Sequence, residues 1–500
     1  MSVMTPGEGL VLIGIFWVIM ISLTWFVSRE DKWRHTGSGF LVAERNLNWI
    51  FGSASIAASW VWAPALFVSV QKTYELGLAG AFWFTAPNVV ALVVFAWLAP
   101  RIRDRFPSGI TFPEWMRFRF GGGAVHKVYL IPYIWYQIMA ICVQVFVGGL
   151  MLNYLTGVDL NVLMLAMLAV GLTYSLISGL RASVVTDFVQ MAFIVVGLIV
   201  VIPWVVIAAG EGAISGGLNG IRGSSNIFNP SIVWSFGIVT SIGLIAGAIS
   251  DQQYWQRSFA IRRGELRKAF VVGGVLFGLV PASLAILGFI AANPAVGVVP
   301  PEGTGLPMIG VATVVALLPK AAAVFFVVML LAGLTSTLDS GLCAASALFA
   351  VDVAPLGVSS DLGAGSTGAA EDADRRLVRR ARVGMFLMAF VGLGMAYLVQ
   401  FVFSLDRLWW IFNGVATCFV VPTILSIFWP RLSRQGVLAS ISVSLLGMVA
   451  FVYGNWTQND VITVVSAIFI VVAGLVAALL LPAKSEWRGV EASAEGSIRS

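Results

Sequence analysis

Long apolar segments, separated by short polar ones, run along almost the whole chain. Each is close in length to the roughly 20 apolar residues that a helix needs to cross a bilayer. Since the backbone of a lipid-exposed segment must be hydrogen-bonded internally, these segments are expected to be helices. The pattern predicts an all-α integral membrane protein with about 13 transmembrane helices, near residues 9–28, 49–70, 78–100, 127–153, 160–178, 184–209, 231–250, 269–292, 321–350, 383–403, 408–429, 435–453 and 460–482.

The composition agrees with this pattern and excludes several classes of protein. Of the 500 residues, 59% are hydrophobic and 11% are charged, and the mean hydropathy is +0.93, whereas soluble proteins have about 25% charged residues. The three cysteines lie in apolar runs, without the spacing of a disulfide framework or a zinc site. The only two histidines, His35 and His126, lie in polar loops, so a histidine metal site or a hydrolytic triad is not expected.

The net charge of +6 would suit a nucleic-acid partner until the basic residues are placed on the spans. With the N-terminus outside, all but four of the 30 lysines and arginines fall in cytoplasmic segments, as the positive-inside rule requires. The four exceptions are Lys72, Arg222, Lys320 and Arg407. We therefore expect a multi-pass protein of the inner cell membrane with a cytoplasmic C-terminus, in contact with lipid and not with nucleic acid.

The start of the chain, one loop and the end of the chain are polar. The opening "MSVMTPGEG" has no basic region of a signal peptide, so the first span is expected to stay uncleaved. Residues 354–374 have the composition of a Gly/Ser/Ala-rich linker, and residues 484–500 are predicted to form a disordered cytoplasmic tail. No appended soluble domain and no obligate protein partner are predicted.

Two spans contain residues that interrupt helices. In the second span, small residues precede Pro64, and because proline removes a helical hydrogen bond, the chain is predicted to unwind between Ala58 and Pro64. A simple proline kink is the alternative. The seventh span has three glycines and is predicted to break in the same way, at Gly237, Gly243 or Gly247.

Interrupted helices at matching positions of two halves favour a transporter built from inverted repeats, with its site between them. The predicted division has an extra N-terminal helix and cytoplasmic loop at 1–47 and a first repeat at 48–210, which holds spans two to six. The second repeat, 211–430, holds spans seven to eleven, and two accessory helices follow at 431–483.

The ninth span carries an unusual polar run, "LTSTLDSGLCAAS", at residues 334–346. An acid within a membrane is costly and is usually functional and paired, so Asp339 needs a partner. The hydroxyls of Ser336 and Thr337 are suited to bind a hard cation, which prefers oxygen ligands. The alternative is that they bond back to the preceding helical turn.

This run, with its small residue, Ser and Thr at Gly333, Ser336 and Thr337, resembles the sodium:solute symporter family. So does "SGLRASVVTDFVQ" at 178–190, apart from Ser178 in place of a glycine. The likeness covers nearly the whole chain and implies a LeuT-like five-plus-five inverted repeat with 13 helices and an outside N-terminus. It also implies a sodium site between the broken second span and the ninth, formed by the carbonyls of Ala58, Val61 and Gly333 and the hydroxyls of Ser336 and Thr337.

The resemblance also implies a role for Asp187, which in the family lies along the inward exit path of the ion. With Asp339 and Ser340, one turn further toward the cytoplasm than Ser336, it is a candidate second cation or proton site. The structural alternative for Asp187 is a helix N-terminal acid that is favoured by the helix dipole and paired with Arg181.

Two further stretches resemble the urea-transporter branch of this family. They are "SWVWAPALFVSVQKTYELGLAGAFWF" at 59–84 and "SDQQYWQRSFA" at 250–260, the second of which is expected to anchor a cytoplasmic loop. Trp60 stands where sugar and proline transporters have Asn or Asp, which argues against those solutes. Pro64, however, stands where the branch has alanine.

A flat aromatic pocket would suit a small planar solute such as urea or a short amide, with indole N–H groups donating to its carbonyl. The predicted pocket residues are Trp60, Trp62, Trp83 and Asn413, with Trp409 and Trp410 as weaker candidates. The alternative for the tryptophans is packing or an interfacial belt.

The sequence thus predicts a secondary active importer, not an enzyme, which uses sodium as coupling ion and no other cofactor. It contains no Walker motif, so ATP is not expected as the direct energy source. Proton-coupled import of another small organic solute, a passive channel or facilitator, and a membrane sensor remain the alternatives.

Overall fold

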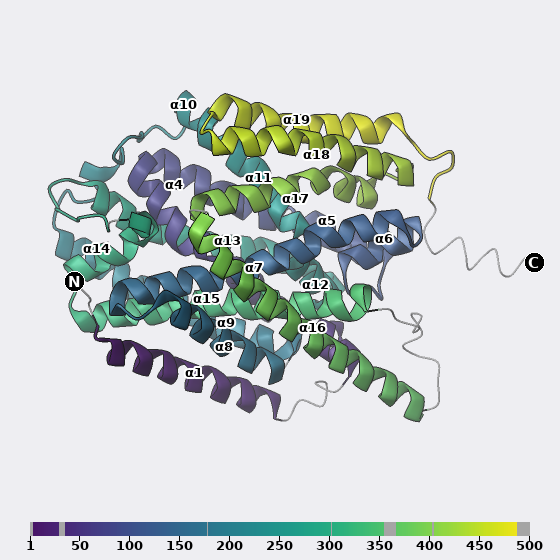
Figure 1. Ribbon diagram of the computed structural model, residues 1–500, viewed down its shortest axis with the longest axis horizontal. Coiled ribbons are helices and arrows are strands. Elements are labelled where there is room, and N and C mark those ends of the chain that lie inside the picture. The colour runs from purple at the N-terminus through teal and green to yellow at the C-terminus, as the bar shows by residue number, and fades with distance from the viewer. Residues whose placement is uncertain are drawn as a thin grey trace, which may run out of the picture.

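Helices make up nearly all the regular structure of the computed structural model, which describes residues 4–29, 36–177, 179–301, 303–354, 367–402 and 405–487. The long helices run roughly side by side, with α1 along one edge of the bundle and the pair α18 and α19 along the opposite edge (Figure 1). The helices are α1 (Pro6–Ser28), α2 (Gly37–Val42), α3 (Trp49–Trp60), α4 (Ser69–Val93), α5 (Phe95–Arg105), α6 (Phe112–Phe120), α7 (Ala124–Thr156), α8 (Leu160–Ile177), α9 (Leu180–Ala209), α10 (Pro230–Ile232), α11 (Ile238–Ser250), α12 (Gln252–Ala260), α13 (Leu266–Ala292), α14 (Ile309–Leu317), α15 (Lys320–Leu348), α16 (Thr367–Val402), α17 (Leu405–Phe428), α18 (Arg434–Trp456) and α19 (Asp460–Leu480).

Short helical turns of other kinds connect these helices. Three are π-helical, at Pro64–Val68, Val233–Gly237 and Phe349–Val353. Within the described ranges, β-type pairing is limited to two isolated bridges, Leu47 with Ile261 and Leu432 with Pro482. Residues 355–366 of the predicted linker and 488–500 of the predicted tail lie outside the described residues.

In the part of the chain that the structure describes, 12 helices are long and apolar enough to cross a bilayer, against about 13 predicted spans. The difference arises in the second predicted span, 49–70, because α3 has only 12 residues. The rest of that span joins the third in one apolar stretch, Pro64–Arg105. Gly77, with a φ of 66°, kinks α4 at the boundary between the two predicted spans.

The second span is interrupted where the sequence predicts it. Helix α3 ends at Trp60, Val61 has a non-helical ψ of 60°, and the chain becomes helical again only at Ala63. Pro64 accounts for part of this break, since it has no N–H to donate to the carbonyl of Trp60 four residues earlier. Helix α3 packs against α9, α13 and α15, so the break lies in the interior of the bundle.

The prediction of a similar break in the seventh span is wrong. The chain stays helical from Pro230 to Ser250, with only a π-helical turn at Val233–Gly237. Its glycines serve close packing instead of unwinding. A Cβ at Gly237 would lie 2.7 Å from the ring of Trp83, and one at Gly247 would lie 2.5 Å from the hydroxyl of Tyr136. The chain departs from the helix only at Asp251, after the span, where α12 begins.

Candidate functional site

The broken second span is held together by side chains from other helices. The hydroxyl of Thr337, on α15, donates to the carbonyls of Val61 at 3.0 Å and Ala58 at 3.3 Å. The N–H of Ala63 donates to the side-chain oxygen of Gln144 on α7, at 3.0 Å. Because buried backbone groups must be satisfied, Thr337 and Gln144 stabilise the unwound residues. Two backbone carbonyls and a hydroxyl thus converge at one point.

The other residues of the predicted sodium site differ in position. Gly333 lies against the break, one turn before Thr337, where an added Cβ would be 3.1 Å from side-chain atoms of Val61 and Leu66. Its lack of a side chain therefore lets α15 approach the unwound segment closely. Ser336 turns away from the break, because its hydroxyl donates to Asp187. The geometry brings Ala58, Val61 and Thr337 together, with Gly333 beside them, and places Ser336 in a neighbouring network.

That network is centred on Asp187, near the start of α9. Its Oδ2 accepts hydrogen bonds from Ser55 at 2.6 Å, Arg257 at 3.1 Å and Ser340 at 3.4 Å, and its Oδ1 accepts one from Ser336. All five side chains are fully buried. A buried carboxylate is tolerated only when it is paired and hydrogen-bonded, and Asp187 meets both conditions.

Arg257 is a member of this network that the sequence does not indicate. The segment at 250–260 was expected to anchor a surface loop, whereas α12 is buried along its whole length. The guanidinium also donates to Ser55 at 2.9 Å and to Ser340 at 2.7 Å. The sequence had offered Arg181 as the partner of Asp187, but the cation found at ion-pair distance is Arg257. The only sequence signal was the resemblance of residues 250–260 to a stretch of the urea-transporter branch, which includes Arg257.

Asp339 faces a different neighbour from Asp187. Its Oδ1 accepts a hydrogen bond from Ser175 on α8, and Cys343 lies 3.9 Å from the same atom. Its Oδ2 is buried and makes no hydrogen bond with any described residue. The three residues of the predicted second site are therefore divided: Asp187 and Ser340 share Arg257, while Asp339 lies beside them with one unsatisfied oxygen.

An aromatic cavity adjoins the break, next to the indole rings of Trp60 and Trp62. Its volume is about 20 Å³, room for about one water molecule. Trp62 stacks on Phe412 at 5.7 Å and contacts Tyr136 at 5.3 Å, and Trp60 contacts Trp62 at 6.2 Å between ring centroids. The lining residues are Trp60, Trp62, Pro64, Ala65, Phe84, Asn88, Tyr136, Leu244, Trp409, Phe412 and Asn413.

Trp83, which the sequence places in the pocket, does not line this cavity. Its indole N–H donates to the carbonyl of Ile227 at 2.7 Å, and its ring packs against Gly237. Trp410 lies behind Trp409 and also does not line the cavity. Its neighbour Phe84, which is 1% exposed, lines the cavity instead.

The polar groups of the cavity also differ from expectation. The indole N–H groups were expected to bind solute, but that of Trp60 donates to Asn88 at 2.8 Å and that of Trp62 to the carbonyl of Ser59 at 3.0 Å. Asn413 instead presents a buried Oδ1 that has no partner among the described residues. This oxygen and the hydroxyl of Tyr136 both lie close to Gly247, each 2.5 Å from the point where a Cβ of that residue would be. Unsatisfied buried polar atoms are uncommon, so this acceptor is available for a ligand.

Known proteins place the chain in a family and confirm its fold. The model of the sodium:solute symporter family matches residues 40–447. The urea-proton symporter DUR3 of Oryza sativa subsp. japonica is 23% identical over 90% of this chain and 66% of its own length. The probable urea active transporter 1 of Schizosaccharomyces pombe is 24% identical over 69% of this chain and 56% of its own length. The chain therefore spans less than two thirds of these relatives.

A solved structure has the same arrangement of helices. It is a Na+-coupled sialic acid symporter in a substrate-bound outward-open state, with a TM-score of 0.73 at 16% identity. The match covers 95% of this chain and 98% of that one. The likeness confirms the predicted all-α, LeuT-like five-plus-five fold, and the family match covers more than half of the chain. This multi-pass membrane protein belongs to the sodium:solute symporter family.

Proposed function

We propose that the protein is a secondary active symporter that imports a small neutral amide, with urea as the favoured solute and sodium as the coupling ion. The observation that carries this proposal is the position of Val61. Its carbonyl joins the oxygen cluster around Thr337, while Trp60 and Trp62 on either side line the aromatic cavity. One interrupted stretch of helix thus faces both candidate sites, which is how transporters of this architecture join solute and ion.

The oxygen cluster suits sodium. Hard cations take oxygen ligands, and the carbonyls of Ala58 and Val61 with the hydroxyl of Thr337 supply three of them. These oxygens are neutral, so the ion is held without a fixed counter-charge and can leave again. A tenfold sodium gradient supplies about 1.4 kcal/mol, and the membrane potential adds about 2.3 kcal/mol per charge per 100 mV. One sodium ion then accounts for accumulation of roughly several hundredfold.

The aromatic cavity suits a flat amide. Indole and phenyl rings offer apolar faces, while the Oδ1 of Asn413 accepts an amide N–H and the hydroxyl of Tyr136 donates to a carbonyl. Two relatives carry names of urea transporters, which supports the same class of solute. The cavity has a volume of about 20 Å³, so a solute has to enter while the surrounding helices are further apart.

Proton coupling is the second candidate, and Asp339 favours it. Its Oδ2 is buried and makes no hydrogen bond of good geometry with a described residue, although the hydroxyl of Ser183 lies near this carboxyl group. A proton on Oδ2 would give this oxygen a hydrogen to donate. The rice relative is named as a urea-proton symporter. In this alternative the solute site is unchanged, and Asp339 carries the coupled proton.

The membrane orientation and the repeats complete the proposal. The placement of basic residues supports an N-terminus outside and a C-terminus in the cytoplasm, in an inner cell membrane. The division into repeats at 48–210 and 211–430, with accessory helices at 431–483, is part of the proposal and is supported by the likeness of the whole fold to a solved symporter.

Uptake into proteoliposomes tests the proposal directly. The purified full-length chain is given labelled urea, formamide or acetamide under an inward sodium gradient, an inward proton gradient, or neither. We expect accumulation above the outside concentration only with the sodium gradient. Accumulation with the proton gradient alone would establish the second candidate. Equilibration in all three conditions would identify a passive facilitator, and binding without transport would favour a membrane sensor.

A further inference from the structure

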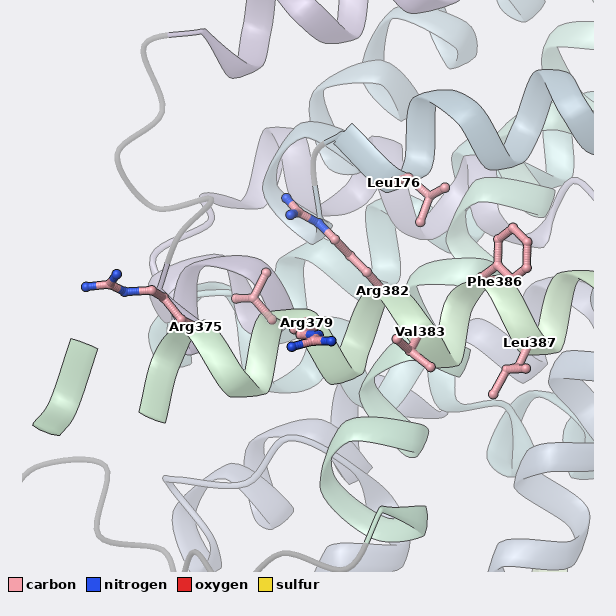
Figure 2. A pocket seen from close by; sticks show the side chains of 8 residues that line it. Leu176, Arg375, Arg379, Arg382, Val383, Phe386 and Leu387 are labelled. Carbon is pink, nitrogen blue, oxygen red and sulfur yellow. The ribbon is translucent and has the colours of Figure 1, made fainter. Parts of the chain in front are cut away.

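A groove on the lipid-facing side of the bundle has basic residues at one end and apolar residues along the rest of its length. It lies between α16 and the end of α8 and has a volume of about 410 Å³. Three arginines, Arg375, Arg379 and Arg382, lie at one end (Figure 2). Three apolar side chains, Val383, Phe386 and Leu387, continue along the same helix, and Leu176 faces them from α8 (Figure 2).

The spacing of the arginines places their side chains on one face of α16. They follow one another at intervals of four and three residues, so they lie on successive turns. Arg375 and Arg379 are exposed, and Arg382 is partly buried with its guanidinium 5.6 Å from the ring centroid of Phe40. Arg375 pairs with Glu371 at 3.0 Å and approaches Asp372 at 3.9 Å. Such exposed pairs contribute little to stability, so they compete weakly with a phosphate.

The apolar part of the groove lies within a membrane-crossing segment. The candidate span Glu371–Phe401 includes both ends of the groove. Val383, Phe386 and Leu387 are 46%, 48% and 48% exposed, which is expected of side chains that contact acyl chains. The arginines lie at the N-terminal end of the same span. The groove therefore reaches from hydrocarbon depth to the level of the headgroups.

We propose that this groove binds one anionic glycerophospholipid of the surrounding bilayer, with its phosphate between Arg375, Arg379 and Arg382 and an acyl chain along Val383, Phe386 and Leu387. Arginine suits this role because its planar guanidinium binds phosphate oxygens in pairs. Basic pockets between membrane helices are a known physical basis for selective lipid binding. The proposal does not depend on which solute or ion is transported.

Native mass spectrometry of the delipidated, full-length protein tests this site. The protein is incubated with phosphatidylglycerol or with phosphatidylcholine of the same acyl chains, and the lipid retained per protein is measured. We expect retention of phosphatidylglycerol by the unaltered protein and a loss of about tenfold or more in Arg375→Gln/Arg379→Gln. This loss is expected because each basic residue near the membrane surface raises the affinity for an anionic lipid by a factor of about five.

The chain offers a matched control on the same helix. Arg376→Gln/Arg380→Gln removes the same charge over the same turns but outside the groove, so it should retain the lipid. An equal loss in both variants would overturn the proposal, since it would indicate general attraction to basic residues. Equal retention of the two lipids would also overturn it, as would displacement of the lipid by millimolar inorganic phosphate. As a second variant away from the charges, Phe386→Ala should weaken retention of the long-chain lipid several-fold.

Discussion

Arg257 and Asp187 form an ion pair of 3.1 Å in which both side chains are fully buried. The pair joins α12 to α9, and through Ser340 and Ser336 it also engages α15, the helix that carries Thr337. The positive charge beside Asp187 is thus part of the protein. A second metal cation at this position would have to displace a guanidinium that makes four hydrogen bonds.

Removing one member of this pair should destabilise the protein more than removing both. Asp187→Asn or Arg257→Gln alone leaves an unpaired buried charge or an unused set of donors, at a cost of about 3–5 kcal/mol. The double variant Asp187→Asn/Arg257→Gln should recover part of that loss. Thermal unfolding in detergent measures it, and additive losses would show that the two charges act independently.

Thr337→Ala should raise the sodium concentration for half-maximal uptake by at least about tenfold, because it removes an oxygen that contacts both carbonyls of the break. Expression should stay normal. Thr337→Ser, which keeps the hydroxyl, is the matched control and should retain most of the sodium affinity. Unchanged sodium dependence in Thr337→Ala would remove this residue from the ion site.

Trp60→Ala should weaken solute binding by roughly tenfold or more while it changes sodium binding less, because the indole is a wall of the aromatic cavity. Trp83→Ala is the control, since Trp83 does not line the cavity. Isothermal titration calorimetry of each detergent-purified variant with urea measures the affinity for the solute, and the same titration with sodium measures the affinity for the ion. If Trp83→Ala alone lost affinity, the solute would bind elsewhere.

Asp339→Asn keeps the shape of the side chain and removes its charge. We expect solute binding to survive and accumulation to fall several-fold, because Asp339 is the buried acid with an unsatisfied oxygen beside the ion pair. Uptake under separate sodium and proton gradients identifies the affected ion. Full accumulation by the variant would assign Asp339 a structural role through its bond with Ser175.

The stability of the protein should fall as the pH rises between about 5 and 7. Burial, together with the nearby Asp352 carboxylate, raises the pKa of Glu114 from 4.5 to about 7. Because the folded protein holds this proton at pH values where the unfolded chain has lost it, folding is favoured at the lower pH. The difference is on the order of 3 kcal/mol.

Unfolding temperatures in detergent from pH 5 to pH 8 measure this dependence. Glu114→Gln keeps the hydrogen bond from the N–H of Ile110 and cannot ionise, so its profile should be flatter over that range. An unchanged slope in the variant would assign the pH dependence to other groups.

Much of the fold follows from one-dimensional features of the sequence. Hydropathy locates the spans, and Pro64 with its small neighbours locates the break. The glycines of the seventh span do not decide between two structures, because glycine permits both unwinding and close helix packing. The residues that surround each glycine in the fold determine which of the two occurs. At Gly247 those neighbours are Tyr136 and Asn413, which are more than 100 residues away in each direction.

The site was partly predictable for the same reason. Thr337 and the break could be connected because a resemblance linked two distant segments. The kink at Gly77 precedes Trp83 in the same helix, so the side that Trp83 faces does not follow from an uninterrupted helical period. The pairing of Asp187 with Arg257 joins two helices 70 residues apart, and no local pattern at either residue indicates the other.

If the protein is the proposed symporter, the break at Val61 also connects the binding of its two ligands. Trp60 and Trp62 line the cavity, and Val61 between them supplies a carbonyl to the oxygen cluster, so a backbone shift at Val61 should alter both sites. Thermodynamic reciprocity then requires that sodium change the affinity for solute by the same factor as solute changes the affinity for sodium. Equilibrium titrations in both directions on the same sample should return a single coupling constant.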